Sequence, residues 1–285
     1  MRTMLLPFAS DETDKSDATI GLTLAAKLNV RPTFLLLRPR LDGLPIYAHL
    51  VGTAGYAAML YDLQSHTELR EASVKEELSS ACKERGLKLD TDGRAQGDAD
   101  VFFVAYEGNP DEAIRRLAAV HDMVVIPRYS RPDEALEVSS LLKSALEYSG
   151  RPILVVTDGV ADDFGSMIAI AWNGSTEGAR AVTGALPLLK QAKGVTIFTV
   201  GTAKTDAQEG ERLRRYLLHH GVSSHTRQFD ADGNVGENLI SAANLSGACL
   251  LISGGYTHSR LRQSIFGGVT HHLLENCRLP LFLAH

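Results

Sequence analysis

An internal repeat constrains the fold of this chain more than any other feature. The segment LEYSGRPILVV, which begins at Leu146, matches LENCRLPLFLA, which begins at Leu274, 128 positions later, with Leu-Glu and a proline in register. Near the start of the chain, MLLPFAS from Met4 resembles MIAIAWNGS from Met167, 163 positions later. Self-similarity at such long spacing indicates one structural unit that occurs twice. The two spacings differ by 35 residues, which predicts an insertion in the first unit.

The insertion lies within residues 41–69. This stretch contains Gly, Pro, Tyr and His and ends in a helix-like periodicity of apolar residues. The periodicity favours a longer helix. A lid or packing arm is the alternative.

Short apolar runs alternate with amphipathic segments in both units, which predicts parallel strands joined by crossover helices. Continuous apolar runs such as CLLI and LPLFLA are typical of strands buried on both faces. The strands expected in the second unit are residues 167–172, 195–200, 225–229, 248–253 and 279–284.

The predicted fold class is α/β, with two tandem doubly wound domains. Each domain is expected to have a five-stranded, mainly parallel sheet with flanking helices. The first domain spans residues 1–157 and the second residues 166–285, on either side of a linker rich in Gly and Asp. We expect residues 152–156 and 279–284, the final strands of the two units, to pair within one chain. Such pairing would make an intramolecular pseudo-dimer, and a homodimer remains an alternative.

Composition narrows the class of protein. The chain has 285 residues, 44% of them hydrophobic, which is enough for a sizeable core. A net charge of −5 gives no general attraction to nucleic acid or to an anionic membrane. The N-terminus lacks the apolar stretch of a signal peptide, and the three cysteines are widely spaced and odd in number. These features predict a cytoplasmic protein that binds neither nucleic acid nor a membrane.

Two glycine pairs near the C-terminus, Gly254-Gly255 and Gly267-Gly268, bracket a basic, polar segment. A glycine-rich turn after a parallel strand lets backbone N–H groups approach an anion, and the following helix N-terminus adds further donors. The expected donors at this helix start are the residues Gly267, Gly268, Val269 and Thr270, with the Thr270 hydroxyl as an additional contact. His258 lies in the same segment and is a candidate contact to phosphate.

The sequence resembles the tandem-domain members of the universal stress protein family over essentially its whole length. The family motif, Gly-x2-Gly-x9-Gly-[Ser/Thr/Gly], falls on Gly254, Thr257, Gly267 and Gly268, so three of its four positions match. The resemblance implies an adenine nucleotide alpha-hydrolase-like fold that binds ATP or AMP and acts in stress response as a sensor or regulator.

Two strand ends in the second unit resemble the family's nucleotide contacts. Asn173 and Gly174 stand where an Asp commonly precedes Gly-Ser, and Asn offers an amide in place of the carboxylate. Val200 corresponds to a position that contacts adenine through its backbone.

The first unit has a different sequence at the motif. Ile126 and Pro127 replace the first glycine pair, and Ser139 and Ser140 replace the second. Proline has no N–H, and side chains block a close approach of the backbone to a ligand. We therefore expect one nucleotide site, in the second domain only. Arg128 and Arg131 could still attract a small anion to the first unit.

The sequence offers little support for catalysis. Ser253-Gly254-Gly255 resembles the phosphate loop of ATP pyrophosphatases. Those enzymes carry the loop after their first strand, whereas here it follows the fourth strand and lacks the subsequent Asp. No Walker lysine or GxSxG elbow is present, so we expect no catalytic residue and at most slow ATP hydrolysis. Adjacent histidines on a helix point about 100° apart, and no metal site is expected. Among the cysteines we expect Cys82 to be exposed. A nucleotide-free scaffold that mediates protein contacts is the alternative function.

Overall fold

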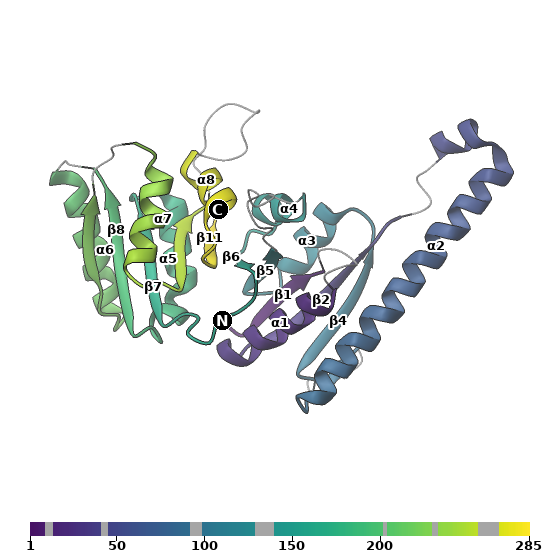
Figure 1. The fold of residues 1–285 in the computed structure, drawn as a ribbon, viewed down its shortest axis with the longest axis horizontal. Coiled ribbons are helices and arrows are strands. Elements are labelled where there is room, and N and C mark those ends of the chain that lie inside the picture. The colour runs from purple at the N-terminus through teal and green to yellow at the C-terminus, as the bar shows by residue number, and fades with distance from the viewer. Residues whose placement is uncertain are drawn as a thin grey trace. The chain divides into compact units, whose positions relative to one another are not determined.

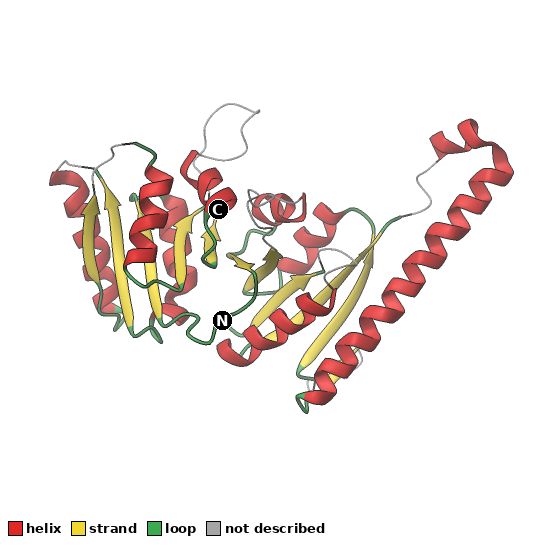
Figure 2. Cartoon of the chain, viewed as in Figure 1, coloured by secondary structure: helices red, strands yellow, loops and turns green. Residues whose placement is uncertain are grey.

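The computed structural model describes residues 1–8, 14–40, 45–91, 99–128, 140–201, 204–229, 233–255 and 268–285. The chain is α/β, with mainly parallel strands and flanking helices, as predicted (Figures 1 and 2). Its contacts divide it into two compact units, residues 2–121 and residues 122–285, the latter joined by Met1. By these contacts, residues 122–157, which end the first sequence repeat, belong to the same unit as the second repeat. The boundaries 1–157 and 166–285, which follow the sequence repeat, stay a prediction.

Residues 2–121 form a parallel sheet in the order β3-β4-β2-β1. Phe34 is fully buried at its centre, and Gly21 of the first helix lies so close that an added Cβ would be 2.6 Å from the Phe34 ring. The absence of a side chain at Gly21 therefore lets this helix pack against the sheet. The elements are β1 (Thr3–Pro7), α1 (Asp14–Leu28), β2 (Arg31–Arg38), α2 (Pro45–Glu84), β3 (Leu89–Asp90), β4 (Val101–Glu107) and α3 (Pro110–Ala118).

The insertion is a helix, as predicted, and α2 extends well beyond residue 69 (Figure 1). Residues 41–44 lie outside the described part of the chain. Val74, Leu78 and Cys82 are buried and recur every four residues, so they form one apolar stripe of α2. The expectation that Cys82 is exposed was therefore wrong, because its charged sequence neighbours lie on other sides of the helix.

Residues 122–285 form a sheet in the order β5-β6-β11-β10-β7-β8-β9. All neighbours described in this sheet are parallel except β6 and β11. The elements are β5 (Met123–Arg128), α4 (Ser140–Tyr148), β6 (Ile153–Thr157), β7 (Met167–Trp172), α5 (Thr176–Leu189), β8 (Gly194–Val200), α6 (Lys204–His219), β9 (His225–Phe229), α7 (Val235–Leu245), β10 (Leu250–Gly254), α8 (Gly268–Asn276) and β11 (Leu281–Ala284). The five strands expected in the second unit are all present, with ends that differ from the prediction by at most two residues.

The strands β6 and β11 pair antiparallel, with Leu154 opposite Phe282 and Val155 opposite Leu281. All four residues are buried. The predicted pairing of the two final strands within one chain is thus confirmed. This pairing covers an edge of each strand that would otherwise expose free backbone groups.

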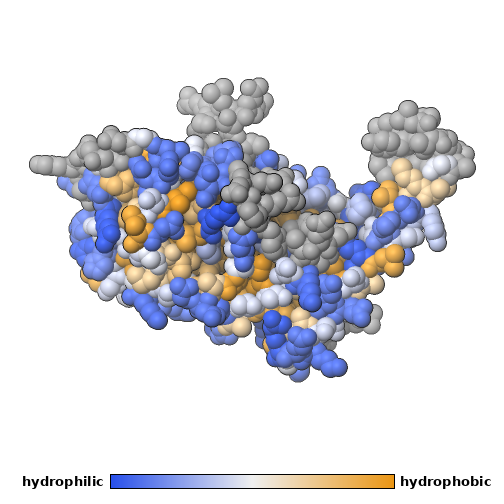
Figure 3. All heavy atoms as spheres, viewed as in Figure 1, coloured by the Kyte–Doolittle hydropathy of each residue, from blue (hydrophilic) through white to orange (hydrophobic). Residues whose placement is uncertain are grey.

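Polar residues cover much of the face shown in Figure 3. Among the described residues, no helix is long and apolar enough to cross a membrane.

Candidate functional site

A pocket of about 240 Å³ lies at the carboxyl ends of β7, β8 and β10, beside the N-terminal ends of α7 and α8. This is the edge of a parallel sheet where doubly wound folds place their ligands. The residues that line the pocket are Ala171, Trp172, Asn173, Ser175, Phe198, Val200, Val235, Leu239, Ser253, Gly254, Gly268, Val269 and Thr270.

Most of the candidate residues from the sequence come together here. The pocket is lined by six of them, namely Asn173, Val200, Gly254, Gly268, Val269 and Thr270. Gly174 is not among the lining residues. His258 and Gly267, together with the motif residue Thr257, lie outside the described residues. The role of every candidate in binding stays a prediction.

The turn between β7 and α5 fixes one side of the pocket. The Asn173 side-chain oxygen, Oδ1, accepts a hydrogen bond from the Ser175 backbone N–H at 3.0 Å. Gly174 has a φ of 73°, a conformation that favours glycine, so its role is to make this turn. Ser175 then caps α5 by accepting a hydrogen bond from the Gly178 N–H, also at 3.0 Å. Since Oδ1 of Asn173 is engaged, its NH₂ group is the part that can meet a ligand.

The first glycine pair is required by packing within the protein. A Cβ on Gly254 would lie 2.8 Å from the Gly178 backbone nitrogen, in the first turn of α5. A Cβ on Gly255 would lie 2.9 Å from the Ala284 carbonyl oxygen, which also accepts a 2.7 Å hydrogen bond from the Gly255 N–H. These contacts explain both glycines without a ligand.

Gly268, from the second pair, has a different environment. No atom of the described residues lies within 4 Å of a Cβ built on Gly268, which begins α8 and lines the pocket. The first N–H groups of a helix have no partner within the helix and carry partial positive charge. Thr270 donates its hydroxyl proton to the Gly254 carbonyl oxygen at 3.2 Å. The Thr270 hydroxyl therefore has no free proton to donate to a ligand. The backbone N–H of Thr270 is the better donor.

Trp172 was missed by the sequence reasoning. It is the single tryptophan of the chain, it ends β7 directly before Asn173, and it lines the pocket. Its indole nitrogen is buried and makes no hydrogen bond to any residue that the structure describes. A buried donor without a partner costs folding free energy, which a ligand acceptor could recover. The only available sequence signal was its place beside the predicted contact residue.

The lining of the pocket carries no charged side chain among the residues that the structure describes. It therefore offers an anion the backbone N–H groups and the dipole of α8. Among the described lining residues, none has a carboxylate, imidazole or amine that could act as a general base. Within the described ranges, no group of three or more His, Cys, Asp or Glu is placed to hold a metal ion.

Arg128 is 6% exposed and supports α8 from β5. It donates hydrogen bonds to the Leu274 carbonyl, to the Cys277 carbonyl at 3.0 Å and to the Thr157 hydroxyl at 3.1 Å. Burial lowers its pKa to about 10, so it is charged at neutral pH. These hydrogen bonds engage both terminal nitrogens of Arg128 within the protein. Arg131 lies outside the described residues, so the small-anion site considered from the sequence stays a prediction.

Solved structures share this fold. A universal stress protein from Archaeoglobus fulgidus DSM 4304 matches with a TM-score of 0.72 and 14% identity, over 99% of this chain and 97% of that one. A protein from Pseudomonas aeruginosa UCBPP-PA14 that carries the same family name matches with a TM-score of 0.60 and 15% identity, over 100% and 93%. The cytoplasmic domain of a prokaryotic cation chloride cotransporter matches with a TM-score of 0.50 and 11% identity, over 99% and 95%.

No protein-family model and no curated protein matches the sequence. The likeness therefore rests on structure. The chain has the α/β fold of tandem universal stress proteins, and the resemblance seen in its sequence is confirmed for the fold.

Proposed function

We propose that this protein binds an adenine nucleotide, ATP or AMP, in the pocket of residues 166–285, and acts as a stress-linked sensor or regulator. The observation that carries the proposal is the convergence of six predicted contact residues on one pocket. These residues come from the ends of β7, β8 and β10 and from the start of α8, which are far apart in the sequence.

The lining suits the parts of a nucleotide. Phe198, Val200 and Leu239 supply apolar surface for a base, and the indole N–H of Trp172 supplies a donor beside it. The N–H groups of Gly268 and Val269 supply donors for phosphate. The volume of about 240 Å³ is below the range of about 300–1,000 Å³ that is common for ligand sites, so only the nucleoside part is expected to be enclosed.

A nucleotide-free scaffold is the second candidate. It is favoured by Gly254 and Gly255, because both have a packing role that needs no ligand. Gly268 opposes it, because nothing in its described surroundings requires a glycine.

Calorimetric titration with ATP, AMP and cyclic AMP tests the proposal. The informative variant is Gly268→Val, which places a branched side chain in the pocket lining. Ser140→Val is the matched control, because Ser140 begins α4 at the position of the first repeat that corresponds to Gly268. We expect binding by the natural sequence and by Ser140→Val and weakened binding by Gly268→Val. Absence of binding at millimolar nucleotide would refute the proposal.

A further inference from the structure

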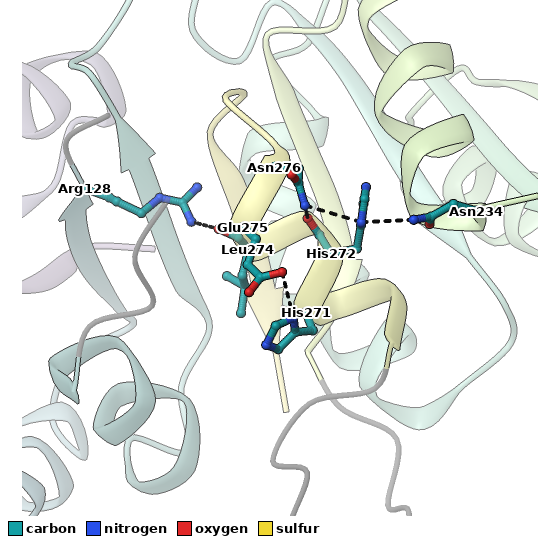
Figure 4. A network of polar contacts seen from close by, with 7 residues as sticks. All are labelled: Arg128, Asn234, His271, His272, Leu274, Glu275 and Asn276. Carbon is teal, nitrogen blue, oxygen red and sulfur yellow. Dashed lines mark hydrogen bonds and ion pairs between the residues drawn. The ribbon is translucent and has the colours of Figure 1, made fainter. Parts of the chain in front are cut away.

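The helices α7 and α8 form one wall of the pocket. Val235 and Leu239 of α7 and Val269 of α8 all line it. A larger spacing between the two helices would therefore open this wall of the pocket. His272, a half-buried residue of α8, lies between them (Figure 4).

Asn234, which directly precedes α7, contacts His272 with its side chain in a defined orientation. Its side-chain oxygen caps α7, accepting hydrogen bonds from the Gly236 N–H at 2.9 Å and the Glu237 N–H at 3.4 Å. Because the oxygen is engaged by these donors, the amide nitrogen is the atom that faces the His272 ring. The distance from Asn234 Nδ2 to His272 Nδ1 is 3.2 Å.

Asn276 approaches the same ring atom from within α8. Its amide nitrogen donates to the His272 carbonyl at 3.0 Å, which fixes the orientation of this amide as well. The same nitrogen lies 3.3 Å from His272 Nδ1. Two N–H donors thus face Nδ1, and both can form a hydrogen bond only when Nδ1 carries a lone pair and the ring proton resides on Nε2.

Packing brings the ring close to the backbone of α7. A Cβ added to Gly236 would lie 2.7 Å from His272 Cδ2 and 2.9 Å from His272 Cβ. The imidazole therefore rests directly against the first turn of α7. A side chain at position 236 would push the ring, and α8 with it, away from α7.

We propose that His272 is a positioning residue for the pocket: its neutral ring joins α7 to α8, and its protonation separates them. A proton on Nδ1 would point at two N–H donors, so the charged ring cannot keep either hydrogen bond. The inference rests on the proposed function, since it predicts that nucleotide affinity falls when the pH is lowered from 8 to 5.5.

The effects of other titratable groups on α7 and α8 must be distinguished from the effect of His272. The first turn of α7 carries Glu237. On α8, His271 Nδ1 lies 3.0 Å from Glu275 Oε2, and both side chains are about half exposed. As Figure 4 shows, this ion pair lies within α8 and does not reach α7. His271→Gln is therefore a matched control, since it removes a neighbouring imidazole and leaves the contact between the helices.

The decisive variant is Asn234→Asp. Asp caps a helix as well as Asn does, so α7 should keep its start. The substitution replaces the N–H donor that faces Nδ1 with an acceptor, which favours a protonated ring. Titrations with AMP between pH 8 and pH 5.5 should show a loss of affinity of roughly fivefold or more in the natural sequence and in His271→Gln. Beyond the part caused by protonation of the AMP phosphate, the loss should be smaller or reversed in Asn234→Asp and absent in His272→Phe. The titration of the AMP phosphate is common to all four proteins.

A second measurement needs no nucleotide. Trp172 lines the pocket and is the only tryptophan, so quenching of its fluorescence by acrylamide reports opening of the pocket. We expect quenching to rise in acid for the natural sequence and to stay constant for His272→Phe. Nitrogen-15 NMR of the imidazole at pH 8 should show the proton on Nε2.

The outcomes distinguish the two proposals. If AMP does not bind, but quenching rises in acid for the natural sequence and stays constant for His272→Phe, the proposed function fails and the positioning role stands. If AMP binds with the same pH profile in the natural sequence, His272→Phe and Asn234→Asp, the positioning role is overturned. A proton found on Nδ1 at pH 8 would also overturn it.

Discussion

Arg128, in β5, donates a hydrogen bond to the main-chain carbonyl of Cys277, 3.0 Å away, just beyond the C-terminal end of α8. It also donates to the carbonyl of Leu274, in the last turn of that helix. A cation at a helix C-terminus interacts favourably with the helix dipole. A strand of the first sequence repeat therefore stabilises the helix whose opposite end lines the pocket.

We expect Arg128→Met to lower the free energy of unfolding by about 2–4 kcal/mol, because it leaves buried carbonyl groups without their donors. Urea denaturation measures this change. The control is Arg116→Met, which removes an exposed pair with Glu112 within α3 and should cost less than about 1 kcal/mol. Equal effects of the two substitutions would contradict the role assigned to Arg128.

The glycines of the two pairs should respond differently to alanine. Gly254→Ala places a methyl group against the backbone of α5, so we expect it to destabilise the fold by about 1–3 kcal/mol. The added methyl group of Gly268→Ala meets no atom of the described residues, so stability should be unchanged or slightly higher while nucleotide binding weakens. Thermal unfolding together with calorimetric titration checks both variants. A stable Gly254→Ala protein would show that the strand end can move away from α5.

The sequence predicted the sheet well because strand signals are local. Residues 167–172 and 225–229 are strands with the same bounds in the prediction and in the structure. The packing of Gly254 against Gly178 could not be foreseen, because it joins a strand and a helix that are distant in the sequence. For the same reason the contact of His272 with Asn234 could not be predicted from the sequence.

Cys82 shows how a local pattern can mislead. Its charged neighbours in SSACKERG suggested exposure, although the burial of a helix residue depends on positions four residues away. Val74 and Leu78 occupy these positions and share the buried stripe with Cys82.

The cysteines provide a last test, through their reactivity. Burial raises the pKa of both Cys82 and Cys277 to about 11, and only the thiolate reacts readily. We expect a maleimide at pH 7 to modify Cys249, which is partly exposed, before the other two thiols, with all three reacting in guanidinium chloride.

The same pKa shifts predict how stability depends on pH. From an ordinary value of 9.0, a thiol with a raised pKa keeps its proton when folded, whereas the unfolded chain loses it as the pH rises. The unfolded state then binds fewer protons, so the free energy of unfolding should decrease between pH 9 and pH 11. Urea denaturation across this range measures the decrease, and Cys82→Ala combined with Cys277→Ala is the comparison. A pH profile that is just as steep in the double variant would assign the effect to other groups.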